Sequence, residues 1–106
     1  MSEHPFDIGR AAFGEEGLAV FQKLGRDIAT FTTLEFWSAR EGGRLGKMLV
    51  DAAALFVAER HKAGGFEDEI AMEAGGIASA VIFKALAERL IEIAASEPAP
   101  AGEVLQ

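Results

Sequence analysis

An almost uninterrupted apolar segment at residues 70–83 constrains this chain more than any other feature. It reads IAMEAGGIASAVIF, and Glu73 is its only charged residue. If the segment is helical, steps of about 100° per residue spread its large side chains around the whole circumference and leave no polar side. Such a helix has to be buried all round. A small chain has little else to bury it with, so the segment predicts a partner, most simply a second copy.

The composition favours a single helical domain. A chain of 106 residues has room for one core. Half of its residues are apolar, and its three prolines lie close to the two ends, so the middle contains no helix breaker of that kind. We therefore expect an all-α protein with a flexible N-terminus at residues 1–9, one helical domain at 10–95 and a disordered tail at 96–106.

The first part of the domain is predicted to be a short N-terminal helix. Apolar residues recur there at spacings of three and four, which places them on one stripe. Three glycines weaken this helix, because each costs about 0.5–1 kcal/mol relative to Ala inside a helix. We expect it to depend on docking against the rest of the chain. The residues of the stripe are Leu18, Phe21, Leu24, Ile28 and Phe31.

A long antiparallel helical hairpin is predicted for the remainder. Its first helix opens at one of two capping-box signals, Thr32-x-x-Glu35 or Ser38-x-x-Glu41, and ends at Gly64-Gly65 after a run of cations. The returning helix opens with the acidic residues 67–69. One short helix cannot cover two long apolar faces, so we expect two hairpins to dimerise into a four-helix core, with the N-terminal helices outside.

The glycine pair Gly75-Gly76 at the centre of the apolar segment allows two interpretations. Small residues four apart permit a second helix to approach closely, whereas two adjacent glycines can also kink or break the helix. Under the first interpretation the segment is the dimer interface. The predicted interface residues are Ile70, Ala74, Gly75, Gly76, Ile77, Ser79, Val81 and Phe83.

The charge distribution limits the classes of partner. The net charge of −7 disfavours a protein whose affinity comes from neutralising phosphates, so nucleic acid is an unexpected partner. Residues 40–62 are the exception, with five basic and three acidic residues. Arg40, Arg44 and Lys47 share a helical stripe there. They form either a solvated face that Asp51 partly neutralises or a docking stripe for an acidic partner.

Motifs that carry chemistry are missing from the sequence. There is no Cys, the glycine-rich stretch at 42–46 lacks the spacing of a phosphate-binding loop, and no Glu-x-x-His pair occurs. His61 is expected to interact with a helix C-terminus rather than with a metal. We therefore expect no enzymatic activity, cofactor or metal. The apolar stretch is shorter than the roughly 20 residues of a membrane span, so we expect a cytoplasmic protein without a membrane segment.

Glu73 and Trp37 each allow a prediction about burial. Glu73 should reach solvent or find a cationic partner, because an unpaired buried carboxylate is costly, and burial would make a dimer pH-dependent. Trp37 lies between the two capping signals, where packing in the core or in an interface is the expected role. An exposed Trp37 would instead mark a recognition surface.

These observations favour a non-enzymatic protein-protein interaction module, such as an adaptor, a small chaperone or an inhibitor, which acts as a homodimer and binds a further, unknown protein. One alternative is an acidic inhibitor of a nucleic-acid-binding protein, of the kind encoded by phages or mobile elements. Another is a helical bundle whose small residues leave a cavity for a small molecule.

Overall fold

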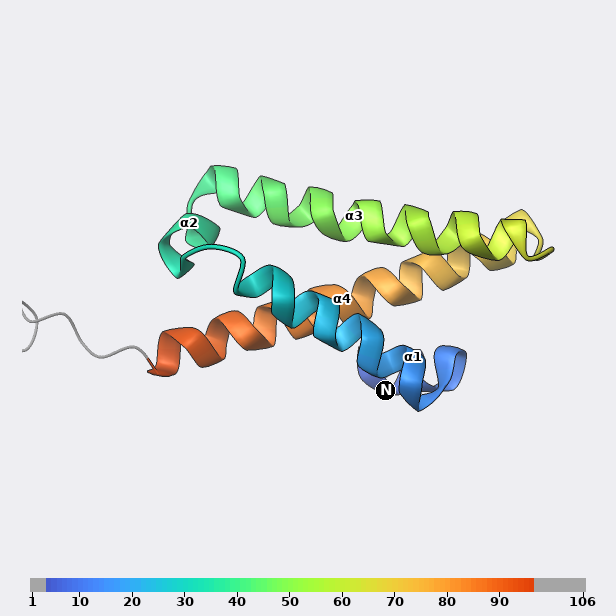
Figure 1. Ribbon diagram of the computed structural model, residues 1–106, viewed down its shortest axis with the longest axis horizontal. Helices are drawn as coiled ribbons and strands as arrows, with labels where there is room; N and C mark the ends of the chain where they lie inside the picture. The colour runs from blue at the N-terminus through green and yellow to red at the C-terminus, as the bar shows by residue number, and fades with distance from the viewer. Residues whose placement is uncertain (1–3, 97–106) are drawn as a thin grey trace, which may run out of the picture.

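The computed structural model describes residues 4–96, which form four α-helices (Figure 1). These residues contain no strand, so the all-helical prediction is confirmed. The helices are α1 (Pro5–Ala29), α2 (Leu34–Ser38), α3 (Arg40–Ala63) and α4 (Asp68–Ser96).

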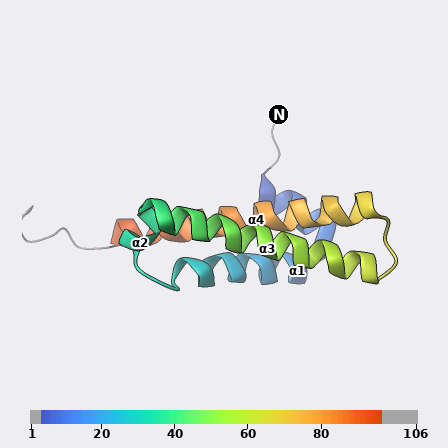
Figure 2. The ribbon, with the colours of Figure 1, turned by 90° about the horizontal axis from the view of Figure 1, so that it is seen from above.

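Helix α4 forms the centre of the fold and packs against both α1 and α3 (Figures 1 and 2). α3 and α4 make the predicted antiparallel hairpin, and α1 crosses α4. Val81 and Ile82 of α4 are the largest fully buried side chains. Ala71 and Ala78 are also fully buried, which shows that small side chains on α4 let its neighbours come close.

Helix α1 begins earlier than the sequence suggested and bends at a glycine. With 25 residues it is as long as α3, so the prediction of a short N-terminal helix was wrong. Pro5 occupies the first turn, and the His4 ring accepts a hydrogen bond from the Phe6 N–H at 3.1 Å, so the helix starts within the region expected to be flexible. Gly14 has φ 79° and ψ 177°, a conformation that is nearly exclusive to glycine. This bend returns the first turns to the side of α4 (Figure 2). Gly9 packs there against Val81. Residues 1–3 lie outside the described part.

The short helix α2 connects α1 to α3. The Thr33 hydroxyl accepts a hydrogen bond from the Phe36 N–H at 3.1 Å, so this helix is capped one residue after the predicted Thr32. The second predicted cap is not used: Ala39 precedes α3, and no side chain caps that helix. Trp37 is buried, as its predicted core role requires.

The turn between α3 and α4 follows the sequence prediction. Gly65 has φ 99°, the Phe66 N–H donates to the His61 carbonyl at 3.1 Å, and the Gly65 N–H donates to the Lys62 carbonyl at 3.0 Å. This pattern is a Schellman motif, which satisfies the last carbonyls of a helix. The chain therefore reverses within a few residues.

Helix α4 is continuous through Gly75-Gly76. A Cβ atom at Gly75 would stand 2.6 Å from the Ala54 carbonyl oxygen, so this glycine permits close packing on α3 rather than a break. Ser96 is the last residue of the helix, and the rest of the predicted tail, 97–106, lies outside the described residues.

By length and composition alone, α4 is also apolar enough to cross a membrane. Its most apolar window of 18 residues has a mean hydropathy of 1.6, and 39% of that window is buried within the fold. The apolar character of this helix therefore extends beyond residues 70–83. A core helix packed on two sides satisfies the same criterion, so the cytoplasmic location stays a prediction.

Candidate interaction groove

One chain leaves part of its apolar surface uncovered. On α4, 68% of Met72 and 59% of Phe83 are exposed, so the segment expected to be buried all round retains an open side. On α3, Leu55 is 65% exposed. The other large apolar side chains that are exposed among residues 4–96 are Val20, Leu24, Phe31, Phe36, Met48, Leu49, Phe56, Phe66, Ile70 and Ile91.

A continuous groove runs between α3 and α4. Its central hollow, of about 620 Å³, shares Gly43, Lys47 and Phe83 with a hollow toward α2, and it shares Asp51 and Gly76 with another toward the hairpin turn. We call these three hollows together the α3–α4 groove. The central hollow is lined by Gly43, Lys47, Val50, Asp51, Gly76, Ser79, Ala80 and Phe83.

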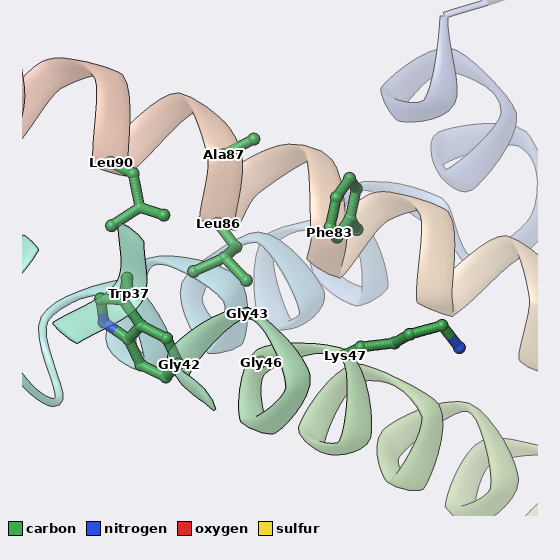
Figure 3. Close-up of a pocket in the computed structure, with 9 residues that line it drawn as sticks. All are labelled: Trp37, Gly42, Gly43, Gly46, Lys47, Phe83, Leu86, Ala87 and Leu90. Carbon is green, nitrogen blue, oxygen red and sulfur yellow. The ribbon is translucent and has the colours of Figure 1, made fainter. Parts of the chain in front are cut away.

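The walls of the α3–α4 groove near α2 are apolar. Figure 3 shows Leu86 and Leu90 projecting from α4 toward α3 and Trp37, and Phe83 of α4 lines the same hollow. The α3 side is built of glycines, and the Lys47 side chain extends along that helix (Figure 3). Bulky side chains on one wall and bare backbone on the other leave a hollow that the chain itself does not fill.

In each of the pairs Gly42-Gly43 and Gly75-Gly76, the first glycine packs against the rest of the chain and the second lines the groove. A Cβ atom at Gly42 would collide with the Phe36 carbonyl oxygen, and one at Gly75 would contact α3. Their neighbours Gly43 and Gly76 are different, because a Cβ atom at either would have no heavy atom within 4 Å. A helical glycine costs about 0.5–1 kcal/mol relative to Ala. Nothing within the described chain explains that cost at Gly43 and Gly76, and both line the central hollow.

The predicted interface residues divide into three groups. Gly76, Ser79 and Phe83 come together in the central hollow. Ile70 and Ile77 line a different hollow with Phe13 and His61. Ala74, Gly75 and Val81 are buried within the chain, where α1 and α3 cover them. Ala74 also borders the hollow of Ile70 and Ile77, and Gly75 borders the α3–α4 groove, so the interface role of these residues stays a prediction.

The basic stripe on α3 is partly paired within its own helix. Lys47 Nζ forms an ion pair with Asp51 Oδ2 at 2.8 Å, and Arg44 Nη1 forms one with Glu41 Oε1 at 3.3 Å. Arg40 is exposed at the first position of α3. Asp51 thus neutralises Lys47 as expected. The pair Lys47–Asp51 supplies the charge in the central hollow of the α3–α4 groove.

Charged groups elsewhere in residues 4–96 lie at the surface. Glu73 is exposed, so it meets the expectation that it reaches solvent. Hydrogen bonds from Arg89 and Arg26 lower the pKa of Glu92 from its ordinary value of 4.5. Within these residues no polar side chain is buried, and no group of three or more acidic or His side chains is placed to hold a metal.

A second hollow, of about 310 Å³, lies between α1 and α3. It is lined by Ile28, Phe31, Leu45 and Leu49, with Asp27 at its edge, where the carboxylate bonds Lys23 at 2.7 Å. The sequence did not predict this site, because its residues come from two helices whose relative placement no periodicity reveals. The apolar stripe on α1 was the available signal.

The chain was compared with family models, with curated proteins and with solved structures. None of the three comparisons found a match.

Proposed function

We propose that the protein is a non-enzymatic helical interaction module that acts as a homodimer joined through the α3–α4 groove. The observation that carries this proposal is the apolar surface left open beside the groove, above all Phe83 and Met72 on α4 and Leu55 on α3. These side chains come from both walls, so a single partner seated in the groove covers them together.

Covering these residues favours association. Complete burial of one large apolar side chain contributes about 1.5–3 kcal/mol. Soluble monomers rarely expose large contiguous apolar patches, and such patches commonly mark interaction sites. The loss of rotational and translational freedom opposes this gain. Several large side chains buried together are therefore required, and the groove supplies them.

Sedimentation equilibrium of the full chain tests this proposal with two matched variants. Phe83→Asp places a charge in the groove, whereas Phe31→Asp makes the same change at a residue that is 78% exposed on the opposite side of the hairpin. We expect Phe83→Asp to shift the mass toward the monomer and Phe31→Asp to leave it unchanged. A wild-type chain that stays monomeric at all concentrations would contradict the proposal.

The two alternative functions receive less support. An acidic inhibitor that imitates phosphates requires regularly spaced, unpaired carboxylates. Asp7, Asp27, Asp51 and Glu92 each pair with a basic side chain. Glu67, Glu69 and Glu73, which have no ion pair among residues 4–96, gather around the start of α4, where negative charge stabilises a helix N-terminus.

A small-molecule site usually places a few polar groups inside an apolar cavity. Among residues 4–96 no polar side chain is buried. Lys47 and Asp51 in the groove are exposed and pair with each other, and Asp27 at the α1–α3 hollow is exposed and pairs with Lys23.

A further inference from the structure

We infer that the two copies pair antiparallel across the α3–α4 groove, about a two-fold axis that brings Lys47 of each copy to Asp51 of the other. This inference rests on the proposed homodimer and adds its register. It is carried by the charge pair at the centre of the groove, by the two unexplained glycines and by the exposed side chains that fit them.

The charge pair decides which partner fits the groove. Lys47 and Asp51 are exposed in the single chain and stand in an otherwise apolar hollow with Ser79 at its wall. A purely apolar partner would remove both charges from water without replacing their contacts, which is costly. A second copy turned by 180° offers Asp51 to Lys47 and Lys47 to Asp51. An interface of this kind is self-complementary, as two-fold symmetry requires.

The antiparallel arrangement of α3 and α4 determines which residue of α4 lies at the two-fold axis. Because Gly75 packs against Ala54, the midpoint between Lys47 and Asp51 on α3 is level with Ala80 on α4. Ala80 is exposed and lines the central hollow. A two-fold axis perpendicular to the helices at this level therefore places the two copies of Ala80 opposite each other.

The same axis pairs each open glycine with an exposed apolar side chain. Gly43 and Leu55 lie at equal distances along α3 on either side of the axis, so Leu55 of each copy reaches the bare backbone at Gly43 of the other. On α4, Gly76 and Phe83 lie on either side of Ala80, and Phe83 of each copy reaches Gly76 of the other. One operation thus gives both glycines a contact and covers both side chains.

The overall charge of the chain agrees with this choice of surface. Two copies of net charge −7 repel each other, so they associate best through a surface that is not acidic. Of the segments 1–39, 40–62 and 63–106, only 40–62, which includes the whole α3 wall, has a basic excess. The α3 residues that line the groove include one cation, Lys47, and one anion, Asp51, so the two α3 walls are neutral and can meet without adding to the repulsion.

Charge reversal in mixed dimers tests the register in the full chain. Lys47→Glu and Asp51→Lys each place like charges at the centre of the symmetric dimer, and each variant alone should associate about tenfold or more weakly than the wild type. An equimolar mixture of the two variants should recover most of the affinity. An intrachain effect cannot produce this recovery, because each chain still carries like charges at 47 and 51.

Cross-linking provides the second readout, since the natural chain has no cysteine. With a short bis-maleimide reagent, Ala80→Cys should yield covalent dimers. Ser96→Cys should not, because the two copies would lie about 48 Å apart, each 16 residues from the axis at 1.5 Å per residue. The side chains altered in these variants are all exposed, so the variants should keep the fold. They are Lys47, Asp51, Ala80 and Ser96.

The outcomes separate the inference from the proposal on which it rests. Recovery in the mixture together with cross-linking at 80 supports the antiparallel register. If the chain dimerises but cross-links through Cys at position 96 and not at position 80, the antiparallel register is wrong while the homodimer is retained. The same conclusion holds if neither charge reversal changes the dimer affinity. A wild-type chain that does not self-associate overturns both.

Discussion

The indole Nε1–H of Trp37 donates a hydrogen bond of 3.0 Å to the carbonyl oxygen of Ala29. Ala29 is the last residue of α1 and is fully buried, while Trp37 lies in α2 with 7% of its surface exposed. The indole ring also packs beside Gly46 of α3. One side chain therefore satisfies a carbonyl at the end of α1 and fixes the position where α3 begins.

Replacement of this side chain should destabilise the fold in two steps. Trp37→Phe keeps a ring but leaves the Ala29 carbonyl without this partner, which should cost about 1–3 kcal/mol. Trp37→Ala also opens a cavity and should cost about 3–5 kcal/mol. Urea denaturation followed by circular dichroism measures both. Equal stability of Trp37→Phe and the wild type would show that the hydrogen bond is unimportant.

The adjacent glycines of α4 should respond to alanine in opposite directions. Gly75→Ala forces its Cβ against the Ala54 carbonyl oxygen at 2.6 Å, so α3 and α4 must separate, at a cost of about 1–3 kcal/mol. Gly76→Ala meets no atom of its own chain and should gain about 0.5–1 kcal/mol in helix stability. Thermal unfolding at dilutions that favour the monomer compares the two variants. A similar loss in both would contradict the division of roles.

The bend in α1 should depend on glycine for its backbone alone. A Cβ atom at Gly14 would meet nothing within 4 Å, but its φ of 79° and ψ of 177° strain any other residue. Gly14→Ala should therefore cost about 1–3 kcal/mol. Glu16→Ala, at an exposed position in the same helix, should change stability by less than about 0.5 kcal/mol. If both variants unfold together, the bend carries no strain.

Glu92 should make a pH-dependent contribution to stability. Its pKa is lowered in the folded chain by Arg89, at 3.0 Å on the same helix, and by Arg26 of α1 at 3.4 Å. A lowered carboxyl pKa stabilises the fold above the ordinary value of 4.5, and this contribution is lost as the pH falls through the lowered pKa. Glu92→Gln should thus be less stable than the wild type at neutral pH, and the difference should vanish in acid. Urea midpoints at several pH values measure it, and a difference that persists in acid would contradict the assignment.

The helices could be predicted from the sequence because their signals are local. The Schellman turn at Gly65 and the spacing of apolar residues act within a few positions of the chain, so the hairpin was predictable. The helix starts were less so. A capping box at Ser38 matches the motif, but Trp37 and Gly42 pack α2 directly against α3 and leave Ala39 in the cap position.

The groove could be predicted only in part because it combines residues from both helices of the hairpin. The segment 70–83 indicated an unsatisfied apolar surface, and Phe83 and Gly76 do face the groove. Its α3 wall, with Gly43 and Leu55, could not be assigned before the two helices were placed against each other. No sequence pattern shows that the bend at Gly14 returns Gly9 to cover Val81.

The molecular mass of the full chain in solution tests the central claim most directly. Light scattering coupled to gel filtration, over a range of micromolar concentrations, should give a mass approaching twice the 11.2 kDa of one chain, and dilution should lower it. The same measurement on Phe83→Asp should give the mass of one chain. A wild-type mass of 11.2 kDa at every concentration would contradict self-association through the α3–α4 groove.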